Sequence, residues 1–250
     1  MNYSEIVKNL VKEADIIIEV LDARFPQKSI NIHLERLVEE KGKKLLRVIN
    51  KSDLTSLNTM KKEKSMLPGS IFVSAKNRKG IMRLKEALGK LSGSGETKIA
   101  VVGYPNTGKS SIINALSGRK SARTSPTAGF TRGVQFVRIN KQTMLIDSPG
   151  VIPFNEHDET LIALLCAKNA QQLKNLEETG IDVADVLLET KKEEILDTYG
   201  VTAKDGEELL EKIAFARKKL RKHGAPDTNA AAMILITDFQ RGILRRKQNT

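Results

Sequence analysis

"GYPNTGKSS", residues 103–111, is the stretch that decides the predicted fold. It follows an apolar run at residues 97–103 and leads into a helix-like segment at residues 110–118. The glycines let the backbone turn so that several N–H groups point inward, and the following helix adds its positive N-terminal end. This Gly-x-x-x-x-Gly-Lys-Ser pattern indicates a loop that binds phosphate groups. An ordinary glycine turn is the alternative interpretation.

The side chains of this loop have separate predicted roles. Lys109 would neutralise the β and γ phosphates of a nucleotide, and Ser110 would give its hydroxyl to Mg²⁺. We expect the nucleotide to contact the rest of the loop as well, that is Tyr104, Pro105, Asn106, Thr107, Gly108 and Ser111.

The residues before this loop alternate between strand-like and helix-like segments. The strand-like segments are short, β-branched apolar runs at residues 14–23, 43–50 and 69–76. The helix-like segments are residues 31–42 and 80–91. Apolar runs with little polar alternation are typical of strands covered on both faces, so the pattern predicts an α/β domain with a parallel sheet. A flexible connector, "SGSGE" at residues 92–96, precedes the strand that enters the phosphate loop.

A second motif, "VINKSDL" at residues 48–54, lies upstream of the phosphate loop. The carboxylate of Asp53 can accept hydrogen bonds from the N1–H and the exocyclic amine of guanine, a pair of donors that adenine does not display on that edge. Asn50 is expected to contact the other side of the base, and Lys51 to pack along it. The end of the next strand would offer a backbone N–H to the guanine O6 from "SAK", that is Ser74, Ala75 and Lys76.

These motifs stand in an unusual order, because the guanine-binding motif precedes the phosphate loop. A sheet is defined by which strands are neighbours, and a doubly wound sheet binds ligands at the carboxyl ends of its strands. Joining the old chain ends and opening new ones elsewhere therefore leaves the binding cleft intact. Such permutation is tolerated where termini lie near each other at the surface. We predict a circularly permuted domain in which residues 92–96 join the two permuted halves.

Two further segments follow the phosphate loop in the order that a nucleotide switch requires. "TSPTAGFTR", residues 124–132, is a polar segment whose Thr131 could complete the magnesium shell. The next segment predicts a hairpin with strands at residues 133–139 and 142–147. It delivers "DSPG", in which Asp147 is expected to hold Mg²⁺ through water and the Gly150 N–H to touch the γ-phosphate. In isolation, the two segments could also be a plain loop and a Pro-Gly turn.

Together the motifs resemble those of the circularly permuted GTPases of the YlqF/YawG type. They are, in order, "DARFP" (residues 22–26), "NKSD", "SAK", "GYPNTGKSS", "GFTR" and "DSPG". The C-terminal part is similar to the family's helical tail, notably at "DTYGV" (197–201) and at residues 226–244. One departure is Ala-Gly-Phe-Thr around Gly129, where relatives tend to have Pro-Gly-x-Thr. The resemblance implies a Ras-like P-loop GTPase domain that binds GTP and GDP and hydrolyses GTP in ribosome assembly.

The resemblance also implies roles around the γ-phosphate, with Lys109, Thr131 and Gly150 acting in hydrolysis. The following residue is Val151, which cannot orient the attacking water as the glutamine of Ras-like switches does, so we expect slow intrinsic turnover. The resemblance implies hydrolysis without that glutamine, stimulated by an assembling ribosomal particle. It further implies that Asn106 helps to hold K⁺ against the phosphates, whereas a plain turn-forming residue is the alternative.

Composition limits the class of protein. The chain has 250 residues, of which 40% are apolar, so it can bury a sizeable core and is long enough for one large or two modest domains. We predict a permuted GTPase domain at residues 1–155 and a basic, all-α domain at residues 156–250. No apolar run approaches the roughly 20 residues that span a bilayer, and the N-terminal sequence lacks a signal-peptide pattern, so we expect a cytoplasmic protein without a membrane partner. The single cysteine, Cys166, lies in an apolar segment and is expected in a core.

Positive charge is concentrated near the C-terminus. The formal net charge is +12, and from Lys212 onward ten lysines and arginines stand against two aspartates. A basic helical tail suits RNA phosphates, although a solvated helix face is the alternative. We expect Phe215 and Phe239 to be packed. Few aromatic side chains are then left for base stacking, which favours recognition of structured RNA over single strands.

We therefore expect a monomeric, GTP-hydrolysing switch that binds ribosomal RNA, with assembly of the large subunit favoured. Permuted GTPases of small-subunit assembly carry an OB domain before the GTPase domain and a zinc domain after it, and neither fits this sequence. Two other hypotheses are a GTP-dependent RNA-binding module without significant hydrolysis, in which Val151 marks lost catalysis, and a regulator of some other RNA or protein.

Overall fold

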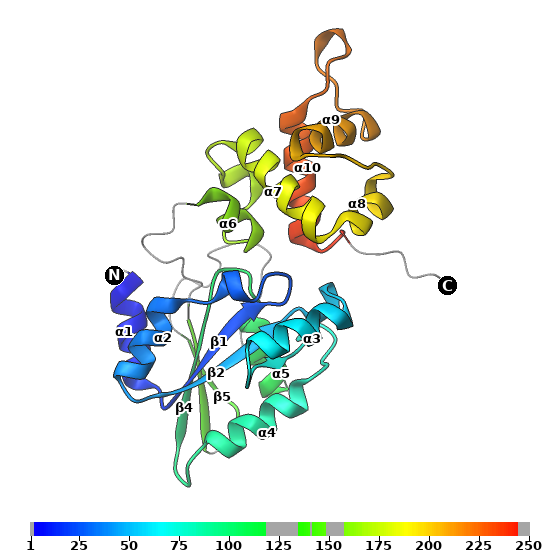
Figure 1. The fold of residues 1–250 in the computed structure, drawn as a ribbon. Coiled ribbons are helices and arrows are strands. Elements are labelled where there is room, and N and C mark those ends of the chain that lie inside the picture. Colours follow the sequence, from blue (N-terminus) through cyan, green and yellow to red (C-terminus); the bar gives the residue numbers. More distant parts are fainter. Residues whose placement is uncertain (1–2, 119–134, 141, 149–157, 245–250) are drawn as a thin grey trace. The chain divides into compact units, whose positions relative to one another are not determined.

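The computed structural model describes residues 3–118, 135–140, 142–148 and 158–244. The chain forms two compact units, residues 1–156 and 157–250. The first unit is an α/β unit and the second is helical (Figure 1). Within the described ranges, every helix is too short or too polar to span a bilayer.

Six strands of the described chain form the sheet at the centre of the α/β unit. They are β1 (Ile16–Asp22), β2 (Lys44–Asn50), β3 (Ile71–Phe72), β4 (Thr97–Val102), β5 (Gln135–Arg138) and β6 (Thr143–Asp147). Their order is β3-β2-β1-β4-β6-β5, and all neighbours are parallel except β5 and β6, which form a hairpin. The predicted parallel sheet and its hairpin are confirmed.

The strand order reverses between β1 and β4, in the middle of the sheet. From β1 the chain runs outward through β2 to β3. After β4 it passes to β5 at the other edge and returns to β6, which lies between β4 and β5. β1 and β4 pair in parallel from Ile16 beside Ile99 to Glu19 beside Val102. Open parallel sheets bind ligands at such a reversal, beyond the carboxyl ends of the strands. The strand order therefore locates the candidate site.

Helices cover both faces of this sheet (Figure 1). They are α1 (Tyr3–Glu13), α2 (Ile32–Glu40), α3 (Leu57–Met66), α4 (Ile81–Leu91) and α5 (Lys109–Ser117), with 3₁₀ turns at Gln27–Ser29 and Ser52–Leu54. Helices α1 and α3 are absent from the sequence predictions. The strand expected at residues 69–76 was predicted too long, because only Ile71 and Phe72 pair with β2 before the chain turns into a loop. Residues 92–96 connect α4 to β4.

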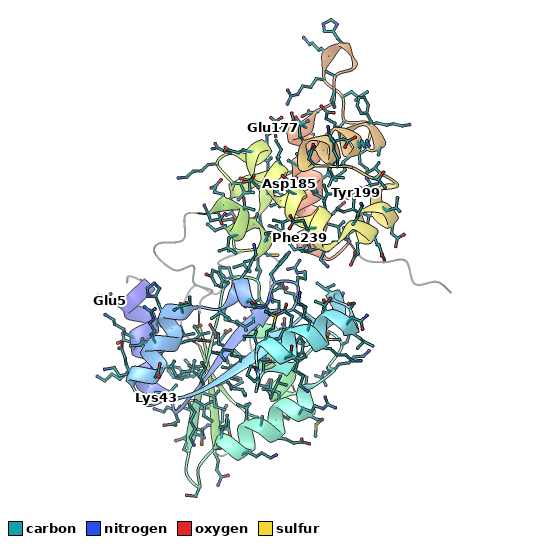
Figure 2. The ribbon with its side chains drawn as sticks, viewed as in Figure 1. Glu5, Lys43, Glu177, Asp185, Tyr199 and Phe239 are labelled. Carbon is teal, nitrogen blue, oxygen red and sulfur yellow. The ribbon has the colours of Figure 1, made fainter. Side chains whose placement is uncertain are left out.

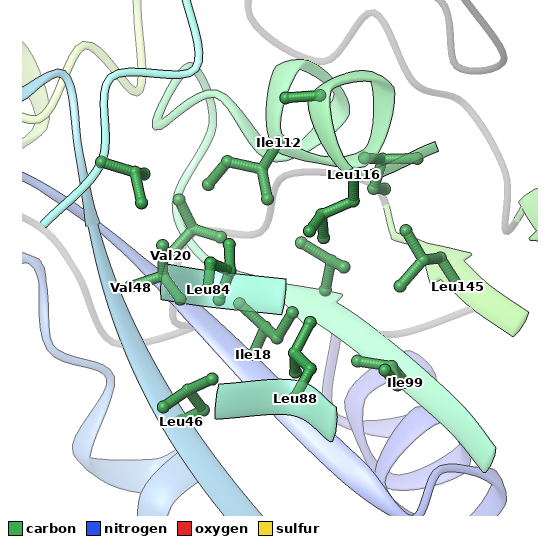
Figure 3. Packing of buried hydrophobic residues seen from close by; sticks show 14 of the residues in the cluster. Ile18, Val20, Leu46, Val48, Leu84, Leu88, Ile99, Ile112, Leu116 and Leu145 are labelled. Atoms are coloured by element: carbon green, nitrogen blue, oxygen red, sulfur yellow. The ribbon is translucent and has the colours of Figure 1, made fainter. Parts of the chain in front are cut away.

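The two faces of the sheet bury separate apolar cores. The core under α4 and α5 contains Ile18, Val20, Leu84, Leu88, Ile112, Leu116 and Leu145 (Figure 3). The core under α1 and α2 contains Val11, Ile17, Leu34, Ala100 and Ile146. Side chains alternate between the faces of a strand, so a strand buried on both faces must be apolar at successive positions. This explains the uninterrupted run Ile16, Ile17 and Ile18.

The second unit is helical throughout its described regular elements. Its helices are α6 (Glu159–Leu164), α7 (Leu176–Thr190), α8 (Lys192–Tyr199), α9 (Gly206–Ala216) and α10 (Thr228–Arg241), with 3₁₀ turns at Ala170–Gln172 and Lys222–Gly224. α7, α9 and α10 contact one another. α7 and α10 approach closely at Gly180, where an added Cβ would lie 2.3 Å from the Cβ of Ala232. A glycine is needed at this crossing for lack of space.

Buried and exposed side chains of this unit test three of the predictions. Phe239 (labelled in Figure 2) and Cys166 are buried, as expected. Phe215 is 53% exposed, so its predicted packing is wrong. The reason is its place near the end of α9, where the chain leaves the helix contacts for the loop that leads to α10.

Glu19 is an exception to the apolar pattern of β1. Its side chain is fully buried, and its Oε1 accepts a hydrogen bond of 2.7 Å from the backbone N–H of Asn31. Its Oε2 lies 4.0 Å from the Nε of Arg47 and has no hydrogen-bond partner within the described residues. Burial raises the pKa of Glu19 well above its usual range, and the nearby carboxylate of Glu35 adds to this. Burial therefore disfavours the charged form of Glu19 in the folded protein.

Replacing Glu19 by glutamine should stabilise the protein at neutral pH. A raised folded-state pKa means that stability is greatest below the unfolded pKa of about 4.3 and falls as the pH rises toward the folded pKa. Glu19→Gln cannot ionise and keeps an oxygen for the Asn31 N–H. Urea unfolding should show an advantage for the variant that grows above about pH 4, by about 1.4 kcal/mol for each unit between the two pKa values. Equal stability of both proteins at about pH 8 would contradict this account.

Candidate nucleotide-binding site

The residues predicted for the site lie in loops at one edge of the sheet. The segments 50–53, 74–76 and 103–111 follow the ends of β2, β3 and β4, and Asp147 is the last residue of β6. These four strands are parallel, so their carboxyl ends point the same way. Loops from distant parts of the sequence are thereby brought together.

The phosphate loop folds around the amine of Lys109. The Nζ atom donates hydrogen bonds to the backbone oxygens of Gly103, at 3.1 Å, and Tyr104, at 2.8 Å. The Thr107 hydroxyl donates to the same Tyr104 oxygen at 2.9 Å. Burial lowers the pKa of Lys109 to about 8, although the carboxylate of Asp147 opposes the shift. Among the described residues, the buried amine donates its hydrogen bonds to neutral carbonyls, so it is well placed to gain a stronger, charge-assisted bond from a phosphate.

Asn50 joins the loops to one another. Its Nδ2 donates to the backbone oxygen of Thr107 at 2.9 Å, and its Oδ1 accepts from the backbone N–H of Ala75 at 3.1 Å. At Gly108, whose φ is +94°, an added Cβ would lie 2.3 Å from the Asn50 Nδ2. The sequence predicts Asn50 as a contact to the base, and that role stays a prediction. Its hydrogen bonds to both neighbouring loops were not foreseen.

Asp53 is oriented by Ser74. The Ser74 hydroxyl donates to the Asp53 Oδ1 at 2.6 Å and accepts from the backbone N–H of Asn77 at 3.2 Å. Asp53 and Lys76 are exposed, whereas Ser74 is fully buried. A buried hydroxyl thus fixes one oxygen of an accessible carboxylate. This arrangement suits a carboxylate that has to meet paired donors on a base.

Ser110 and Asp147 form a donor set beside the phosphate loop. The Ser110 hydroxyl donates to the Asp147 Oδ2 at 2.9 Å. The Asp147 Oδ1 is buried, and no described residue offers it a hydrogen bond. Burial raises the pKa of Asp147, while the hydrogen bond from Ser110 and the charge of Lys109 oppose the rise. An orphaned carboxylate oxygen next to a hydroxyl is a hard oxygen donor set of the kind that Mg²⁺ prefers, so these residues fit that ion.

Other predicted residues fall outside the described ranges. These are Thr131, Gly150 and Val151, together with the rest of residues 124–132. Their roles at the γ-phosphate stay predictions.

One charged pair next to the site was not assigned a role from the sequence. Asp22 ends β1, and the Nη2 of Arg24 lies 2.7 Å from its Oδ2, with both side chains almost fully buried. The signal for it was present in "DARFP", where two opposite charges directly follow an apolar strand. Such a buried pair needs a reason, because removing two charges from water is costly.

Sequence comparisons agree with this geometry. The family described as "50S ribosome-binding GTPase" matches residues 98–161, which include the phosphate loop and Asp147. An uncharacterized GTP-binding protein of Methanocaldococcus jannaschii is 38% identical over 245 residues, which cover 96% of this chain and 65% of that protein. Nuclear/nucleolar GTPase 2 of Arabidopsis thaliana is 31% identical over 245 residues, which cover 93% of this chain and 42% of that protein. The chain spans less than two thirds of the length of either relative.

Comparison with solved structures identifies the fold. GDP-bound YlqF of T. maritima superimposes with a TM-score of 0.68 at 24% identity, covering 96% of both chains. The GNP-bound form of YlqF gives a TM-score of 0.63 and covers 96% of this chain and 93% of that one. The sheet order and the phosphate loop after β4 define a circularly permuted P-loop GTPase fold. Its particular arrangement is that of the YlqF type, and the resemblance predicted from the motifs is confirmed.

Asp147→Asn should uncouple nucleotide retention from magnesium. The variant keeps an oxygen that can accept from Ser110 but loses the charge that would hold the ion. In the unaltered protein, chelation of Mg²⁺ should speed the release of labelled GDP by at least about tenfold, equivalent to about 1.4 kcal/mol. In Asp147→Asn the same chelation should change the release rate little. Asp53→Asn serves as the control, because it should weaken GDP binding yet keep the response to chelation. A normal response in Asp147→Asn would exclude the carboxylate from the metal site.

Proposed function

We propose that this chain is a GTP-binding and GTP-hydrolysing switch that acts in ribosome assembly. The observation that carries the proposal is the pair of hydrogen bonds at the Asn50 amide, which donates to the Thr107 oxygen and accepts from the Ala75 N–H. They hold a guanine-selective carboxylate, Asp53, and a phosphate loop at one edge of one sheet. In this proposal Asp53 selects guanine over adenine, and Lys109 binds the β and γ phosphates.

Hydrolysis in this proposal relies on charge and position more than on a protein base. Lys109, Thr131 and Gly150 would surround the γ-phosphate, and Mg²⁺, held by Ser110 and Asp147 and completed by Thr131, would neutralise developing charge. Val151 replaces the glutamine that orients water in Ras-like switches, so turnover by the chain alone would be slow. The missing group would then come from a partner, or from K⁺ held near Asn106.

The names of the similar proteins support a ribosomal partner. The matching family is described as binding the 50S ribosome, and the plant relative is described as nuclear and nucleolar. We propose a monomer that works in the cytoplasm on the maturing large subunit and contacts its RNA. A GTP-dependent RNA-binding module without significant hydrolysis is the alternative, since Val151 fits both.

GTP turnover with and without ribosomal particles separates these two functions. We expect a slow basal rate, a rise of at least about tenfold with large subunits and a smaller effect of small subunits, by comparison with GTPase activators that add about 10³-fold or more. The same assay in potassium and sodium chloride tests Asn106, because equal rates in both salts would remove the K⁺ role. No turnover under any of these conditions would favour the non-enzymatic module.

The helical unit offers a defined surface for RNA. We call residues 217–226, between α9 and α10, the basic hairpin. It is closed by a bridge between Leu220 and Pro226 and by a hydrogen bond of 2.8 Å from the Arg221 N–H to the Ala225 oxygen. In Figure 1 it protrudes from the ends of these helices. Its exposed cations are Arg217, Lys218, Lys219, Arg221 and Lys222.

The cations of the basic hairpin differ in how they are held. Arg217 lies over the Tyr199 ring, 5.2 Å from its centroid, and Arg221 lies within 4.0 Å of two carboxylates, those of Glu177 and Asp227. Tyr199 and Glu177 are labelled in Figure 2. The three lysines extend from a backbone fixed by these contacts. A protruding cluster of amines on a hydrogen-bonded hairpin suits phosphate binding better than a uniformly solvated helix face does.

Replacing Lys218, Lys219 and Lys222 together by glutamine should weaken binding to large-subunit ribosomal RNA. Three lost phosphate contacts should reduce the slope of log affinity against log salt concentration by about two to three, because each contact releases close to one counterion. The matched control replaces Lys61, Lys62 and Lys64 of α3, which removes the same charge and should leave the slope nearly unchanged. Equal loss in both triple variants would show that net charge alone is responsible.

A further inference from the structure

The "DARFP" turn holds a buried carboxylate at the end of β1. The guanidinium of Arg24 grips Asp22 through two bonds, from Nε to Oδ1 at 2.9 Å and from Nη2 to Oδ2 at 2.7 Å. The backbone N–H of Arg24 adds a third bond to Oδ1 at 3.1 Å. Burial would raise the pKa of Asp22, but the charges of Arg24 and Lys51 outweigh it and hold the pKa well below its usual range. Asp22 is thus a fixed anion.

Lys51, in the guanine-binding motif, is tied to this anion. Its Nζ donates to the Asp22 Oδ2 at 2.7 Å. Its backbone is left-handed, with φ 64° and ψ 34°, which is uncommon for a residue with a side chain. Asp22 lies beside Asn50 in the register of β1 and β2. The ion pair therefore makes the side chain of Lys51 run from the end of β2 to the end of β1.

The end of β1 adjoins the phosphate loop. The first residue of that loop, Gly103, lies so near β1 that an added Cβ would be 2.5 Å from the Val20 oxygen. The side chain of Lys51 therefore spans the gap from the end of β2 to the end of β1, the strand that the phosphate loop adjoins.

We propose that Asp22, which is held by Arg24, is a positioning residue. Its ion pair with Lys51 keeps the lysine side chain extended across this gap, where its methylenes form an apolar surface under the guanosine of the bound nucleotide. The inference rests on the proposed function, since it assumes that guanosine occupies this edge of the sheet. In this arrangement the four methylenes of Lys51 contact the guanosine, and the ammonium group holds the side chain in place through Asp22. Arg24 also neutralises Asp22, so the Asp22 carboxylate keeps an ion-pair partner when its bond to Lys51 is broken.

A double-mutant cycle on GDP affinity tests the proposal. The variants are Asp22→Asn, Lys51→Met and the two combined, measured by titration with fluorescent GDP. If Asp22 acts through Lys51, each single change should weaken GDP binding by about tenfold, and the double variant should also lose about tenfold. A double variant that loses about a hundredfold would show independent roles and overturn the proposal.

Two further measurements keep the result interpretable. Lys51→Met leaves the bond between Asp22 and Arg24 in place, so unchanged GDP binding in this variant alone overturns the proposal even if Asp22→Asn fails to fold. Glu19→Gln removes another buried carboxylate from the same strand, three residues from Asp22, and should bind GDP as the unaltered protein does. Failure of the unaltered protein itself to bind GDP would instead refute the proposed function.

Discussion

The site depends on the hydrogen bonds made by the side-chain amide of Asn50. Its two hydrogen bonds reach Thr107 and Ala75, which lie on opposite sides of the connector at residues 92–96. One side chain therefore joins the two permuted halves of the domain at the ligand edge. Each such bond contributes only about 1 kcal/mol net, but losing the amide would leave backbone groups of two loops unpaired. With no space for a Cβ at Gly108, neither loop can shift without disturbing the other.

Permutation preserves this geometry and changes what is attached to it. The sheet keeps β1 beside β4, so the carboxyl edge forms although the loops after β2 and β3 precede the phosphate loop in the chain. The chain now leaves the sheet after β6, whose last residue is Asp147, and the next described helix, α6, begins at Glu159. The helical unit thus follows, along the chain, the strand that ends in Asp147.

The motifs and the buried strands could be predicted because each combines residue type with spacing. Helix α3 could not, since none of its residues is buried and no apolar stripe marks it. Phe215 was expected to be packed because aromatic side chains in helices usually are. It is exposed instead, at the end of α9 where the loop to α10 begins. The bonds from Asn50 to Thr107 and from Lys51 to Asp22 join residues 57 and 29 positions apart. They depend on strand register, which the sequence pattern alone does not fix.

The buried acids of the α/β unit differ in how their charge is compensated. Asp22 is satisfied by two cations and stays ionised, which suits an anchor. Glu19 and Asp147 each keep one oxygen without a hydrogen bond from the described residues, and burial raises the pKa of both. Glu19 accepts a hydrogen bond from the Asn31 N–H at the start of α2, and burial disfavours its charged form. Asp147 ends a strand beside Ser110 and near the charge of Lys109, and its orphaned oxygen there fits a bound cation.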